Sequence, residues 1–98
     1  MTIVNDGGFR SEEIELFSEL AAPQLLERLD QTSTGFEIRL KISDREGKDQ
    51  KVTLQLFTKF LEPITAVSCL DDIPAALKDV ERKAFEQFNK ARDKKFSQ

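Results

Sequence analysis

Two stretches near the middle of the chain alternate apolar and polar residues. Residues 36–43 read "FEIRLKIS" and residues 51–57 read "KVTLQLF". Successive side chains of a strand point to opposite faces, so this period of two predicts two strands with one buried face each. The polar stretch "DREGKDQ" joins them, and a hairpin centred on Gly47 brings apolar residues opposite apolar residues, a parity that a one-residue slip would destroy. The predicted pairs are Ile42 with Val52, Leu40 with Leu54, and Ile38 with Leu56.

The segment 58–70, "TKFLEPITAVSCL", admits a helix on its length. Pro63 and the β-branched residues after it favour a third strand over about 64–70. With a turn near 61–63, antiparallel pairing would place Val67 opposite Phe57 and Cys69 opposite Gln55.

The C-terminal segment has the clearest helical pattern, from about residue 73 to 95. Asp71 or Asp72 is placed to cap it, and Pro74 falls in its first turn. A helix of this length measures roughly 34 Å, about the diameter of a domain of this size, so it should span the domain or overhang it. Its apolar stripe consists of Ile73, Leu77, Val80, Ala84, Phe88 and Ala91.

The N-terminal third predicts a helix interrupted by Pro23. Ser11 is a candidate N-cap, acids follow it, and apolar residues then recur at three-to-four spacing. Pro23 favours either a kink or a second short helix that carries Leu25, Leu26 and Leu29. Residues 1–10, with two adjacent glycines, predict a flexible arm.

These elements predict one two-layer α+β domain over residues 11–98. The order is a kinked helix or helix pair, a three-stranded antiparallel meander, and a long C-terminal helix, or α-β-β-β-α. The 98-residue length fits a single domain. We expect the apolar face of the meander to pack on the C-terminal helix.

Composition narrows the chemistry. The chain has no histidine and one cysteine, which disfavours a structural zinc site and excludes an intramolecular disulfide. It shows neither a signal peptide nor an apolar run that could span a membrane, so we expect a cytoplasmic protein. We expect no metal, no cofactor, no membrane partner and no small-molecule substrate.

No set of residues predicts catalysis. Cys69 lies in an apolar context with no histidine to activate it. The carboxylate pairs Glu12-Glu13 and Asp71-Asp72 stand at predicted helix starts, where capping explains them. Gly7-Gly8 lacks the remainder of a phosphate-binding loop. We therefore expect a protein that is not an enzyme.

Two groups of apolar residues are candidate interfaces. Phe57, Val67 and Cys69 would form an apolar island on the polar face of the sheet, which either the N-terminal helices cover or a partner contacts; they could also be scattered exposed residues without a role. Large residues at the far end of the long helix predict either ordinary core or a dimer contact, and these are Phe85, Phe88 and Phe96.

Charge adds two alternatives, since residues 1–30 carry seven acids and two bases whereas the rest of the chain is slightly basic. Bases on the sheet and in the C-terminal tail could bind nucleic acid, namely Arg39, Lys41, Lys51, Lys59, Lys90, Arg92, Lys94 and Lys95. Acids of the first helix could enter a basic groove of a partner, as in a small inhibitor, namely Glu12, Glu13, Glu15 and Glu19.

The preferred hypothesis is a non-catalytic protein-interaction module of adaptor, accessory or inhibitor type that acts as a homodimer. The alternatives are a nucleic-acid-associated accessory protein and an acidic inhibitor. The net charge of −3 and the shortage of aromatic residues on the sheet argue against nucleic acid.

Overall fold

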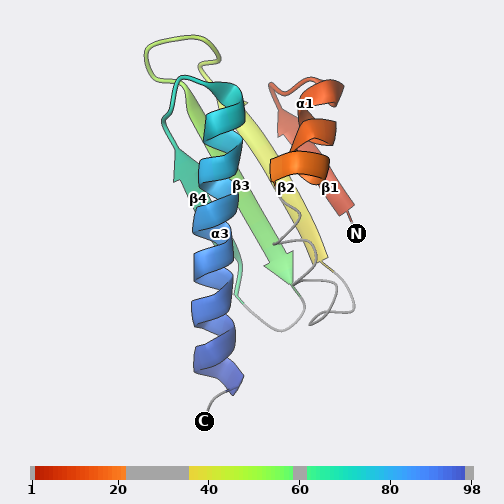
Figure 1. Cartoon of the computed structure of the whole chain (residues 1–98), viewed down its shortest axis with the longest axis vertical. Helices are drawn as coiled ribbons and strands as arrows, with labels where there is room; N and C mark the ends of the chain where they lie inside the picture. Colours follow the sequence, from red (N-terminus) through yellow and green to blue (C-terminus); the bar gives the residue numbers. More distant parts are fainter. Residues whose placement is uncertain (1, 22–35, 59–61, 97–98) are drawn as a thin grey trace.

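The computed structural model describes residues 2–21, 36–58 and 62–96, which form a four-stranded sheet with its helices on one face (Figure 1). In chain order the elements are β1 (Thr2–Gly7), α1 (Ser11–Leu16), the π-helical turn η1 (Phe17–Ala21), β2 (Phe36–Ser43), β3 (Lys51–Thr58), β4 (Ile64–Ser68) and α3 (Ile73–Phe96). The strand order is β1-β2-β3-β4. The α+β class is confirmed. The three predicted strands form an antiparallel meander, β2-β3-β4. The prediction of a three-stranded, purely antiparallel sheet is wrong, because β1 adds a fourth strand in parallel.

The β2–β3 hairpin forms with the predicted register. Its pairs include Ile42 with Val52, Leu40 with Leu54, and Ile38 with Leu56. In the connecting loop, the Gly47 N–H donates to the Asp44 carbonyl at 2.8 Å. The alternating pattern excludes every odd shift, which would expose the apolar set, and folding symmetrically about Gly47 selects this register among the even ones.

The apolar face of the sheet is the core of the protein. The side chains of Ile38, Leu40, Val52, Leu54 and Leu56 are fully buried. Burying an aliphatic side chain of this size contributes about 1.5–3 kcal/mol relative to leaving it exposed. This face therefore supplies much of the free energy that holds the two layers together.

Helix α3 covers the half of this face that β3 and β4 form (Figure 1). It begins as predicted, because the Asp72 carboxylate accepts the Ala75 N–H at 3.1 Å and Pro74 occupies the first turn. Leu77, Val80, Ala84 and Phe88 of its stripe are buried. Its lower end runs past the sheet in Figure 1, as its length predicted. No helix of the described residues is long and apolar enough to cross a membrane.

The segment expected to be a flexible arm contains β1, which pairs parallel with β2 from Thr2 opposite Glu37 to Gly7 opposite Lys41. The turn after β1 depends on Gly8, whose φ is +88°. A Cβ there would also collide with the side chain and carbonyl of Ile42. Gly8 thus marks a close approach of two chain segments. The three-strand prediction missed β1, because its partner β2 lies far along the sequence.

Strand β4 forms where the β-branched residues predicted it, but its register differs from the prediction. Val67 pairs with Thr53 and Thr65 pairs with Gln55. The predicted partners of Val67 and Cys69 are thus wrong by four positions, and Cys69 lies just beyond the end of β4. A shift by an even number leaves every side chain on its own face, so the alternating pattern could not detect it.

The first helix starts one residue earlier than predicted. Arg10, not Ser11, is its N-cap, and the Arg10 N–H donates to the Glu13 carboxylate at 2.8 Å. The chain then passes into η1, where Phe17 is fully buried in the core. The kink or second helix predicted at Pro23 falls outside the described residues.

Candidate functional site

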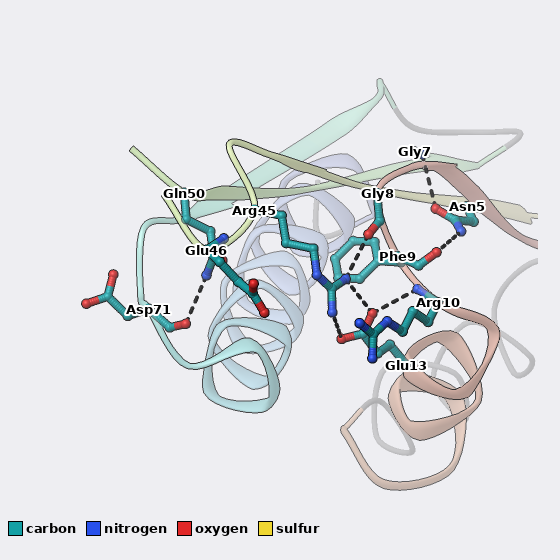
Figure 2. Close-up of polar contacts among 10 residues, drawn as sticks. All are labelled: Asn5, Gly7, Gly8, Phe9, Arg10, Glu13, Arg45, Glu46, Gln50 and Asp71. Carbon is teal, nitrogen blue, oxygen red and sulfur yellow. Dashed lines mark hydrogen bonds and ion pairs between the residues drawn. The ribbon is translucent and has the colours of Figure 1, made fainter. Parts of the chain in front are cut away.

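Polar contacts join three loops at one end of the sheet, and we call this region the polar joint. Its first part is a two-point ion pair between Arg45 of the hairpin loop and Glu13 of α1, with N–O distances of 2.6 and 2.7 Å (Figure 2). Arg45 also donates to the Gly8 carbonyl at 2.7 Å. The hydrogen bond from Arg45 holds the pKa of Glu13 below its ordinary value, and the Arg10 N–H adds to this although burial opposes it.

The second part of the polar joint is Gln50, which is 3 % exposed. Its amide donates to the Asp71 carbonyl at 3.0 Å, and its oxygen accepts the Glu46 N–H at 2.8 Å (Figure 2). The same amide also donates to the Leu70 carbonyl at 3.0 Å. Gln50 therefore ties the hairpin loop to the segment between β4 and α3. Every polar group of this side chain is engaged within the chain, so the polar joint is structural.

No titratable group in the polar joint resembles a catalytic centre. The Glu13 carboxylate, whose ion pair lies within the polar joint, is engaged by the Arg45 guanidinium. Among the described residues, no three side chains of the metal-ligating types gather to hold an ion.

The face of the sheet opposite the helices is the open face. All described helices pack on the other side (Figure 1), so no described element covers it. A hollow of about 350 Å³ lies on this face, over β2 and β3 and beside the end of β1. It is lined by Asp6, Arg39, Lys41, Ser43, Lys51, Thr53 and Gln55.

The three bases of this hollow have different surroundings. Arg39 is engaged by Glu37 at 2.7 Å and by Asp6 at 3.2 Å, and these acids raise the pKa of its guanidinium further. Lys41 and Lys51 are exposed, and neither forms an ion pair with another described residue. The free positive charge of the hollow therefore belongs to the two lysines.

The predicted apolar island is divided by the observed register. Phe57 is half-buried and pairs with Glu37, near the opposite end of β3 from Lys51. Val67 lies beside Thr53, and Cys69 is an exposed free thiol. Phe57 and Val67 both lie on the open face, but they do not form one patch.

Two of the phenylalanines predicted as an interface on the long helix, Phe85 and Phe88, contact the core. Phe88 is only 2 % exposed, and Phe85 is half-buried against the core. Turn η1 contacts α3, so part of the N-terminal region packs on this helix. Phe96 is the last residue of α3, and its side chain is outside the described set.

The predicted basic residues do not form one surface. Arg39, Lys41 and Lys51 share the open face, whereas exposed Lys90 lies on α3 in the other layer. Lys59 is outside the described residues, as are the side chains of Arg92, Lys94 and Lys95. Of the predicted acids, Glu13 turns inward to Arg45, and three remain exposed along α1 and η1: Glu12, Glu15 and Glu19.

Side chains of α3 close one edge of the sheet. The Lys83 ammonium donates to the Val67 carbonyl at 2.8 Å, and the Gln87 amide donates to the Thr65 carbonyl at 3.0 Å. These carbonyls belong to β4, an edge strand that would otherwise offer them to another chain. Lys83 also forms an ion pair with Asp79. Hydrogen bonds from Lys83 and from the Ser68 hydroxyl lower the pKa of the Asp79 carboxyl group.

Sequence reasoning missed Arg45, Gln50, Lys83 and Gln87. Each acts on a partner at least sixteen positions away or on a backbone carbonyl. A glutamine that follows a polar loop gives no signal of burial. Only the predicted hairpin, which carries Arg45 and Gln50 toward the helix layer, could have drawn attention to them.

No protein-family model matches this sequence, and comparison with curated proteins finds no similar sequence. The function is therefore inferred from the geometry of the folded protein alone.

Proposed function

We propose that this protein is a small, non-catalytic protein-interaction module that binds its partner through the open face of the sheet. One observation supports this most: the helices pack on one side of a four-stranded sheet and leave the other side without a described cover. The open face is broad, bears a hollow, and combines half-buried Phe57 and Val67 with unpaired lysines. Such a mixture of apolar anchors and polar groups is typical of protein interfaces.

The alternative of nucleic-acid binding has weaker support. Among the described residues of this face, Lys41 and Lys51 offer unpaired positive charge, whereas Arg39 is engaged by acids. Two phosphate contacts give little affinity at physiological salt. Phe57 is the one aromatic side chain of the described sheet available for stacking a base, far along β3 from the lysines.

The test is affinity capture with matched surface variants, with and without nuclease. Gln55→Arg with Thr65→Arg places two bulky groups at the centre of the open face, where these residues are direct neighbours. Lys78→Glu with Lys90→Glu changes two exposed residues of α3 and serves as the control. We expect a nuclease-resistant, stoichiometric protein that the wild type and the α3 control retain and the open-face variant loses.

Two results would contradict this proposal. Equal capture by the wild type and the open-face variant would exclude the open face as the binding surface. Capture that nuclease abolishes would favour the nucleic-acid alternative. Circular dichroism of each variant separates lost binding from lost folding.

A further inference from the structure

We propose that the open face receives a second copy of this chain, with Glu12 and Glu15 of one copy entering the hollow between Lys41 and Lys51 of the next. This inference rests on the proposed function, because it uses the same face and names the occupant. Both halves of the contact, the lysines of the hollow and the glutamates of α1, are present on one chain. Neither half forms an ion pair with another described residue.

The cationic half follows from the hairpin register. Lys41 pairs with Thr53 and Lys51 pairs with Ser43, so the two lysines are diagonal neighbours on one face, with Cα atoms about 7–8 Å apart. Two ammonium groups that line one hollow repel each other, and Asp6, the acid that lines the hollow, is turned to Arg39. An incoming carboxylate would relieve this repulsion.

The hollow also offers neutral donors to a carboxylate. Ser43 makes only a long contact of 3.5 Å with the Lys51 carbonyl, so its hydroxyl is free to turn. Thr53 and Gln55 line the same hollow. Hydrogen bonds to an ionised acceptor are stronger than those between neutral groups.

The anionic half is the outer side of α1. Glu12 and Glu15 are three residues apart, so their side chains lie on the same side of the helix with Cβ atoms about 5–6 Å apart. Glu19 follows on η1, and all three are exposed without an ion pair to another described residue. The spacing of this pair is close to that of the lysines, so two carboxylates can meet two ammonium groups.

The two halves are on opposite sides of the sheet. Helix α1 lies in the helix layer (Figure 1), whereas the hollow is lined by residues of the open face. The contact is therefore heterologous: each copy offers one hollow and one acidic helix. Contacts of this kind build rings or open chains rather than a two-fold dimer. A head-to-tail assembly thus replaces the symmetric homodimer expected from the sequence.

The first test is sedimentation of the wild-type protein at increasing concentration. We expect the average mass to rise without stopping at a dimer in about 0.01 M salt, where the Debye length is about 30 Å, and to fall toward the monomer in about 1 M salt, where it is about 3 Å. A wild type that stays monomeric at low salt and at the highest concentration reached would overturn the proposal.

The sharper test mixes two variants that each keep one half of the contact. Lys41→Gln with Lys51→Gln removes the positive charge of the hollow, and Glu12→Gln with Glu15→Gln removes the negative charge of the acidic helix. We expect each variant to be monomeric alone. Their mixture should form a one-to-one complex and nothing larger, because only one productive contact remains. Self-association of either variant at the wild-type level would overturn the proposal.

Lys78→Gln with Lys90→Gln has the same net charge as the hollow variant and controls for general repulsion. It should associate like the wild type, and its loss of association would assign the effect to net charge and overturn the proposal. The proposed function is tested separately from the head-to-tail contact. A monomeric wild type whose open face still retains a partner leaves that function standing, whereas head-to-tail assembly without a captured partner supports self-association alone.

Discussion

The two faces of the sheet come from the same strands and have opposite fates. On the closed face, Leu40 and Leu54 pair across β2 and β3 and are fully buried under the helices. On the open face, one residue along each strand, Lys41 and Thr53 pair in the same ladder without a described cover. Alternation alone places one residue of each strand in the core and its neighbour on the open face. Substitutions on the two faces should therefore have different consequences.

The largest effect is expected at the centre of the closed face. Leu54→Ala should lower the free energy of unfolding by about 2–5 kcal/mol, because it removes buried methyl groups and leaves a cavity. Thr53→Ala, one position away on the open face, should change it by less than about 1 kcal/mol. Urea denaturation measures both. Equal losses for the two variants would mean that the open face is also packed.

A smaller effect is expected at the polar joint. Gln50→Ala should cost about 1–3 kcal/mol, because the Leu70 and Asp71 carbonyls and the Glu46 N–H lose a buried side-chain partner in a partly buried position. The matched change on the open face is Gln55→Ala, which should cost less than about 0.5 kcal/mol. A Gln50 variant as stable as the Gln55 variant would show that water satisfies these groups without cost.

The smallest effects are expected at the ion pairs, where the polar joint and the open face again differ. Glu13→Gln should cost about 1 kcal/mol near neutral pH, because the pair with Arg45 is two-pronged and partly buried. Arg39→Gln should cost less than Glu13→Gln, since the Arg39 side chain is 40 % exposed and solvent screens its ion pairs. Thermal or urea unfolding resolves the difference.

The Glu13 contribution should also depend on pH. Its pKa in the folded protein lies below the ordinary value of 4.5. A carboxyl group with a lowered folded pKa stabilises the fold fully above its unfolded pKa and loses this contribution as the pH falls through the folded one. The stability gap between the wild type and Glu13→Gln should therefore narrow as the pH drops below 4.5. A gap that stays constant would assign the effect to packing.

Local patterns predicted the hairpin and α3 because both follow from contacts close in sequence or from a single periodicity. Residues 36–43 and 51–57 alternate cleanly, and Asp72 and Pro74 mark the start of α3. The candidate bases Arg39, Lys41 and Lys51 fell on one face for the same reason. Whether Arg39 was free could not be predicted, because one of its partners, Asp6, comes from β1.

The amino-acid sequence by itself determined which side chains of the hairpin face the core, since the period of a strand decides that without reference to anything distant. Only the tertiary structure decided that β1 joins the sheet in parallel, that β4 pairs four positions from the expected register, and that the helices share one face. Parallel pairing joins segments distant in sequence, and an even shift of register preserves every face. Neither the parallel pairing of β1 nor the register of β4 changes the local pattern of apolar and polar residues. Both depend on how the sheet and the helices pack.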